Sequence, residues 1–193
     1  RQRGGLPPGS LPGRVRYVRT DPPWVQSPLV SYGWRRQDGV MTEICDECGF
    51  DSRRVVDVVA GLRAVLTAMH CLLTDPDVDQ RPAPETWSAT EYVEHSLFVV
   101  RETAEEVAVA AGQAVATPPT DCMGALAIVD ALVAGPAGRR LDELMLDTPF
   151  ATISARDNLP HALHDLEHHL LDIRRGYSRI ALTRGDDLHT TAR

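Results

Sequence analysis

Apolar side chains recur at helical spacing in four stretches of the chain, and this periodicity is the main structural signal in the sequence. In the first stretch, which begins at Ser52, the apolar positions are Val55, Val58, Val59, Leu62, Val65, Leu66, Met69, Leu72 and Leu73. This i, i+3, i+4, i+7 series is typical of a helix that buries one face. It predicts a long helix that ends before the sequence TDPDVDQRPAP.

Capping signals indicate where two further helices begin. Ser88 and Glu91 have the spacing of a capping box, in which each side chain satisfies the backbone amide of the other residue. The helix that they start is predicted to run to about Gly112. After the turn-forming sequence ATPPTD, Asp121 is a candidate cap for a shorter helix in DCMGALAIVDALVAG.

The last helix is predicted from Asn158 or Leu159 to Ile180, with Pro160 tolerated because it would lie in the first turn. Between Gly135 and this helix the pattern is mixed and predicts one short helix followed by an extended crossover. No segment has a convincing strand pattern. We therefore expect an all-α fold, a four-helix bundle with one long connection before its last helix.

Composition divides the chain into four parts. Residues 1–40 are rich in Gly, Pro and Arg and are interpreted as a flexible or non-native extension, since MTEICDECGFD resembles a natural protein start. Residues 41–51 form a start segment with a CxxC motif. Residues 52–182 are the predicted bundle, and residues 183–193 are a predicted flexible tail.

Charge and hydropathy restrict the classes of partner that the chain is expected to bind. The net charge of −7 argues against non-specific binding of nucleic acid, because phosphate backbones require concentrated Lys and Arg. No run of eighteen apolar residues and no secretory leader pattern occurs, so we expect a cytoplasmic protein without a membrane partner. The apolar surface that four helices leave exposed is compatible with a homodimer.

The last helix is unusually rich in histidine: HALHDLEHHLLDI holds four of the seven histidines. At about 100° per residue, a single core face collects Leu159, Leu163, Leu166, Leu170, Ile173 and Tyr177. Asp165 and His169 border this face at i, i+4 spacing, which lets two side chains bind one ion. His164 and His168 have the same spacing but lie farther from the core, where they either orient ligands or face water.

A third ligand is needed from another helix, and His95 is the candidate. It lies near the start of the second predicted helix, beside a core stripe at Val93, Leu97, Val100, Ala104 and Val107. Three protein ligands that leave positions open are typical of a catalytic metal site. The alternative, that these histidines belong to a solvated polar face, stays open at this point.

The sequences WSATEYVEH and HDLEHHLLDI together resemble the DinB-like superfamily, which includes the mycothiol-dependent maleylpyruvate isomerases. The resemblance covers about residues 52–182 and implies a four-helix bundle. It also implies a divalent metal bound by His95, Asp165 and His169, where Asp165 is shorter than the glutamate or histidine more usual at its position. Mixed imidazole and carboxylate ligands suit zinc, nickel, iron or manganese.

The same resemblance implies a function. In the thiol-dependent branch, the metal activates a low-molecular-weight thiol for attack on an electrophile, so the expected activity is a mycothiol-type S-transferase or isomerase. The expected partners are a small-molecule thiol and an electrophile. The alternatives are a non-enzymatic stress or regulatory module that binds metal and a metal-dependent hydrolase.

Cys45 and Cys48 have the CxxC spacing of half a zinc ribbon. Cys71, Cys122 or His70 are candidates to complete a tetrahedral site. The other interpretations are a redox-sensitive dithiol and a pair of inert thiols. The sequence leaves all three open.

Overall fold

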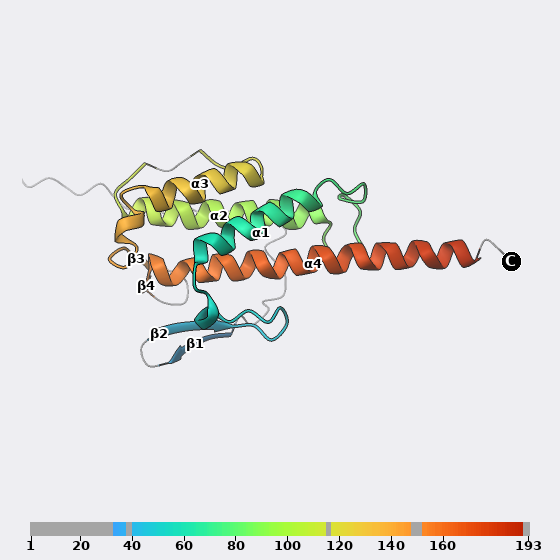
Figure 1. The fold of residues 1–193 in the computed structure, drawn as a ribbon, viewed down its shortest axis with the longest axis horizontal. Helices are drawn as coiled ribbons and strands as arrows, with labels where there is room; N and C mark the ends of the chain where they lie inside the picture. Colours follow the sequence, from blue (N-terminus) through green and yellow to red (C-terminus); the bar gives the residue numbers. More distant parts are fainter. Residues whose placement is uncertain (1–32, 38–39, 115–116, 148–151, 191–193) are drawn as a thin grey trace, which may run out of the picture. The chain divides into compact units, whose positions relative to one another are not determined.

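The computed structural model describes residues 33–37, 40–114, 117–147 and 152–190, with the side chains of residues 42–184 outside these gaps. Residues 1–32, most of the expected extension, lie outside the described residues. Four α-helices dominate the described part: α1 (Val58–Leu72), α2 (Ala89–Ala110), α3 (Cys122–Ala134) and α4 (Ala155–Thr190). The prediction of a mostly helical protein is confirmed (Figure 1).

The helices begin where side chains satisfy their first amides. At α2 the capping box forms as predicted, with the Ser88 hydroxyl accepting from the Glu91 amide and the Glu91 carboxylate accepting from the Ser88 amide. Asp121 caps α3 as predicted. The first helix begins later than predicted, because Asp57 accepts from two amides there and residues Ser52–Arg54 form a separate 3-10 turn.

The last helix is longer than predicted at both ends. It begins at Ala155, and Pro160 therefore lies inside it rather than in its first turn. The earlier start is stabilised by backbone bonds from the Ala155 amide to Leu144 and from the Arg156 amide to Leu141. At the other end, residues predicted as a flexible tail are helical to Thr190, and Arg184 is anchored by an ion pair to Asp77, with Nη1 2.6 Å from Oδ2.

Two short antiparallel hairpins accompany the helices, although no strand is predicted. β1 (Gly33–Gln37) pairs with β2 (Val40–Ile44), from Gly33 opposite Ile44 to Gln37 opposite Val40. This hairpin spans the boundary expected between residues 40 and 41. β3 (Met145–Asp147) pairs with β4 (Thr152–Ser154) just before α4, in place of the extended crossover. The 3-10 turn at Gly138–Arg140 stands where the short helix is predicted.

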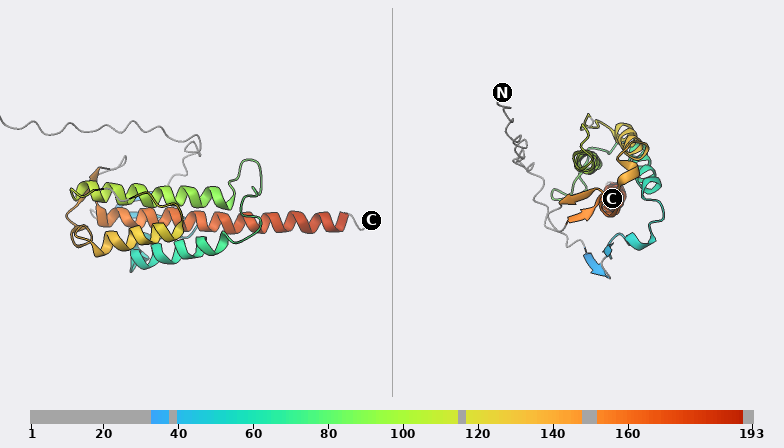
Figure 2. Two further views of the ribbon diagram at one scale, coloured as in Figure 1. Left: turned by 90° about the horizontal axis from the view of Figure 1, so that it is seen from above. Right: turned by 90° about the vertical axis from the view of Figure 1, so that its left-hand side faces the viewer.

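Each of the four helices packs against two others: α4 contacts α1 and α2, and α3 covers the other side of the same pair (Figure 2). The interior is apolar, and α4 contributes its predicted face to it. Buried residues on that face are Leu159, Leu163, Leu166, Leu170 and Ile173. Burial of such side chains contributes about 1.5–3 kcal/mol each, so α4 is fixed in rotation about its own axis.

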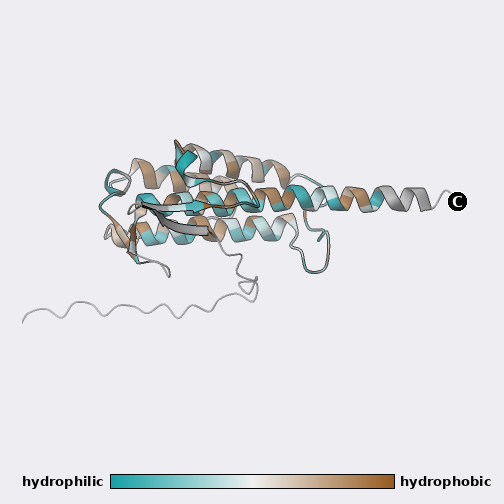
Figure 3. Cartoon of the chain, turned by 90° about the horizontal axis from the view of Figure 1, so that it is seen from below, coloured by the Kyte–Doolittle hydropathy of each residue, from teal (hydrophilic) through white to brown (hydrophobic). Residues whose placement is uncertain are grey.

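Polar residues of α4 lie on the side covered by the β1–β2 hairpin and the segment after it (Figure 3). His164 and His168 are buried there, at 0 % and 5 % exposure. Of the two alternatives left open for these histidines, exposure to water is excluded, because the chain around Cys45 folds over them. None of the described helices is long and apolar enough to cross a membrane.

Candidate metal centre

Among the described residues, four groups of side chains that could hold a metal ion include residues of α4. Two of these groups, Glu43–His161–His164 and Glu47–His168–Asp172, each share a histidine with a neighbouring group. The remaining two groups have no residue in common. The first, here called the His95 cluster, consists of His95, Asp165 and His169. The second, the cysteine cluster, consists of Cys45, Cys48, His164 and His168. In each group, one candidate ligand atom per residue can be chosen so that all lie within 4.8 Å of one another.

The His95 cluster joins α2 to α4. His95 Nε2 lies 3.4 Å from Asp165 Oδ2, and His169 Nε2 lies 3.7 Å from the same oxygen. For metal–ligand distances of about 2.0–2.2 Å, two ligands of a tetrahedral ion are about 3.3–3.6 Å apart. The spacing therefore fits a divalent ion without rearrangement of the helices.

The Asp165 carboxylate is the negative centre of this cluster. Burial alone would raise its pKa, but the hydrogen bond with His95 and the charges of His169 and His95 outweigh burial and lower the pKa to about 2. Asp165 is consequently ionised at neutral pH. An ionised carboxylate and two imidazoles are a ligand set that zinc, nickel, iron and manganese accept.

Aromatic side chains surround the two imidazoles. The Trp87 ring lies 5.6 Å from that of His95 and 6.1 Å from that of His169, and Tyr92 lies 5.1 Å from His169. Burial, followed by the negative charge of Asp172, raises the pKa of Tyr92 to about 12, which keeps its phenol neutral. Trp87 also lines a small hollow together with Pro82, Ile173 and Tyr177.

His95, Asp165 and His169 are the ligands predicted from the sequence, and the structure brings them together. The sequence predicted this grouping because the leucine face of α4 sets the rotation of the helix. That rotation turns Asp165 and His169 toward α2. His169 is additionally held by Asp172, whose Oδ2 lies 3.4 Å from His169 Nδ1. Carboxylates in this position commonly fix the orientation of a metal-binding imidazole.

The histidines that complete the cysteine cluster were not foreseen, because they lie more than a hundred residues from Cys45 and Cys48 in sequence. The Cys45 sulfur lies 3.7 Å from His168 Nδ1. Neither Cys71, Cys122 nor His70, the expected candidates, belongs to any of the clusters that the described residues form. Cys122 is buried in the core, whereas Cys71 and His70 are exposed on α1.

Glu43 is the buried acid beside this second cluster, at 2 % exposure. Its Oε1 lies 2.6 Å from His164 Nδ1 and 3.0 Å from His161 Nδ1. Burial opposes ionisation of Glu43, but the bonds to both histidines outweigh it and lower the pKa of the carboxyl. Burial would lower the pKa of His164, yet its bond to Glu43 raises that pKa.

The two thiols of the cysteine cluster differ in pKa. Burial would raise the pKa of Cys45, but amide donation from Cys48, a hydrogen bond from His164 and amide donation from Glu47 lower it to about 6. Burial raises the pKa of Cys48 to about 11. Neither thiol is part of a disulfide.

Comparison of the chain with family models, with curated proteins and with solved structures gives no match.

Proposed function

We propose that the chain is a DinB-like four-helix bundle whose His95 cluster binds a divalent metal and activates a low-molecular-weight thiol of the mycothiol type for transfer to an electrophile or for isomerisation. The observation that carries this proposal is the convergence of His95 from α2 with Asp165 and His169 from α4. The resemblance of WSATEYVEH and HDLEHHLLDI to the DinB-like superfamily supports it.

The chemistry that a metal supplies in such a site, when bound, is a lowered pKa of a coordinated thiol or water. The protein supplies the ligands and fixes their orientation. Asp165 provides the anionic ligand, and Asp172 orients His169. Three protein ligands leave at least one position for a substrate sulfur.

The surroundings of the cluster suit a small organic thiol. Trp87 and Tyr92 place apolar rings beside His169 and limit access of water on that side. The Tyr92 hydroxyl, held neutral, is able to donate a hydrogen bond to an anionic sulfur or oxygen.

The experiment has two parts. Metal content is first measured for the wild-type chain, for His169→Ala and for His70→Ala, which removes an exposed histidine from α1. We expect His169→Ala to lose the metal of the His95 cluster and His70→Ala to retain it. Equal metal content in all three proteins would contradict the assignment of the site.

The second part screens the metal-loaded chain with low-molecular-weight thiols and electrophiles. Transfer or isomerisation that requires both the thiol and His169 supports the proposal. Hydrolysis of esters or amides without a thiol would instead support a hydrolase that uses the same open site. Metal binding without either activity would favour a regulatory module.

A further inference from the structure

Cys45 and Cys48 lie on one tight turn of the chain directly after β2. The Cys45 amide donates to the Phe50 carbonyl at 2.9 Å. Gly49 adopts a φ of 78°, a left-handed conformation that favours glycine. Its amide donates to the Cys45 carbonyl at 2.9 Å, which closes the turn.

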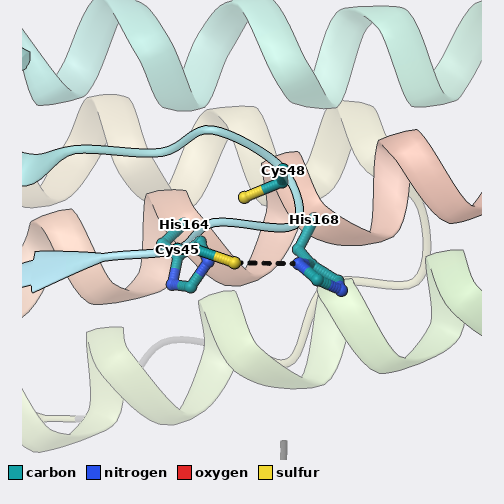
Figure 4. Close-up of side chains that lie close together, drawn as sticks. All are labelled: Cys45, Cys48, His164 and His168. Atoms are coloured by element: carbon teal, nitrogen blue, oxygen red, sulfur yellow. Dashed lines mark hydrogen bonds between the residues drawn. The ribbon is translucent and has the colours of Figure 1, made fainter. Parts of the chain in front are cut away.

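Two imidazoles of α4 face this turn (Figure 4). His164 and His168 are one helical turn apart, and a ligand atom of each lies within 4.8 Å of ligand atoms of both cysteines. The measured separation of 3.7 Å between Cys45 Sγ and His168 Nδ1 is close to the value of about 3.6 Å expected for a sulfur and a nitrogen on one tetrahedral zinc ion.

Each of these two imidazoles has a carboxylate near one of its ring nitrogens. Glu43 Oε1 lies 2.6 Å from Nδ1 of His164, and a ring that bonds a carboxylate through Nδ1 coordinates a metal through Nε2. His168 has the reverse arrangement: Nδ1 is near the Cys45 sulfur, while Nε2 lies 3.7 Å from Glu47 and 3.8 Å from Asp172. Carboxylate–histidine pairs of this kind are common around zinc.

We propose that Cys45, Cys48, His164 and His168 form a closed structural zinc site that fastens the segment of residues 42–51 to α4. Four protein ligands complete a tetrahedral shell and leave no position for substrate, in contrast to the three ligands of the His95 cluster. Two thiolates and two imidazoles select zinc over magnesium, calcium or manganese. The site is independent of the proposed function, because it shares no ligand with the His95 cluster.

The test uses the full-length chain, reduced, loaded with zinc and freed of excess metal. Bound zinc is measured for the wild type, for Cys48→Ser and for Cys71→Ser, the control that removes an exposed cysteine from α1. We expect Cys48→Ser to lose about one zinc equivalent and Cys71→Ser to lose none. Zinc content unchanged by Cys48→Ser would overturn the proposal.

Cobalt(II) substitution of the wild type gives a readout that does not depend on the folding of a variant. Thiolate ligands produce sulfur-to-cobalt charge-transfer absorption, and a tetrahedral site produces intense visible bands. We expect both in the wild type and in His169→Ala, which alters only the other cluster. Absence of the charge-transfer absorption, or isolation of a Cys45–Cys48 disulfide from zinc-loaded protein, would overturn the proposal and identify the pair as a redox dithiol.

Discussion

His168 and His169 are adjacent in sequence, yet their rings are nearly perpendicular, at 88°, with centroids 6.1 Å apart. His168 faces the Cys45 sulfur, and His169 faces Asp165 and His95. A step of about 100° along α4 thus assigns neighbouring histidines to two different clusters.

Substitution of Asp165 tests whether the His95 cluster needs a negative ligand. Asp165→Asn keeps the size of the side chain but removes its charge, so we expect metal affinity at this cluster to fall by more than about 100-fold, beyond the usual effect of losing an orienting group. Asp165→Glu retains the charge and is expected to bind metal. Titration of the metal-free proteins with zinc measures both. Equal affinities of Asp165→Asn and the wild type would show that the carboxylate is not a ligand.

Asp172 connects the two clusters, because its Oδ2 lies 3.4 Å from His169 Nδ1 and 3.8 Å from His168 Nε2. Asp172→Asn should weaken metal binding at both clusters, by about 10- to 100-fold each, because both imidazoles lose an orienting carboxylate. Competition with chelators of graded affinity resolves the two binding steps. The control is Asp130→Asn, which removes an exposed carboxylate paired with Arg63 on the α1–α3 side. An effect confined to one step would show that Asp172 serves only one cluster.

Removal of metal should loosen the segment of residues 42–51 and leave the helices intact. The helices share an extensive apolar core, whereas the segment after β2 contacts α4 through Phe50, the bonds of Glu43 to two histidines and the side chains of the cysteine cluster. On addition of a chelator, we expect hydrogen exchange to accelerate at the amides of Cys45 and Gly49, while amides within α1 and α2 stay protected. Exchange that accelerates equally everywhere would indicate global destabilisation, and unchanged exchange would mean that the segment is held without metal.

The capping box of α2 should make stability depend on pH in the acid range. The ion pair with Arg81 is the main cause of the lowered pKa of Glu91, whose carboxylate also accepts from the Ser88 amide at 2.9 Å. Because the pKa is lower in the folded state than in the unfolded state, the stabilisation is present above about pH 4.3 and is lost as the pH falls through the folded value. Thermal unfolding at neutral pH and near pH 3 measures this loss.

Glu91→Gln should flatten this pH dependence, since the amide cannot titrate. Glu85→Gln, at an exposed position in the preceding loop, is the matched control and should behave as the wild type. Parallel profiles of Glu91→Gln and the wild type would contradict a stabilising role of the carboxylate in this range.

Sequence periodicity predicted the four helices because a helix that buries one face has apolar residues at regular spacing within one continuous stretch of chain. The leucines of α4 also set its rotation, and with it the approach of Asp165 and His169 to His95. Capping residues were predicted for the same reason: the interactions of Ser88 with Glu91 and of Asp121 with Gly124 span only three residues.

The features that the sequence did not reveal depend on distant partners. The 3.7 Å contact of Cys45 with His168 joins residues 123 positions apart, and local spacing carries no information about it. The β1–β2 hairpin escaped prediction because its short strands lack clear alternation. The start of α4 before Pro160 rests on amides of Ala155 and Arg156 that bond to Leu144 and Leu141 in the preceding segment.

The single helix that supplies ligands to both clusters has a consequence for how this chain tolerates length changes. Positions 164 and 168 serve one cluster, and positions 165 and 169 serve the other, so both pairs span Leu166. Deleting one residue there would shift each pair to i, i+3 spacing and rotate one half of α4 by about 100° relative to the other. A single-codon deletion would therefore disturb both proposed ion sites at once, whereas substitution of one ligand residue disturbs only the site to which that ligand belongs.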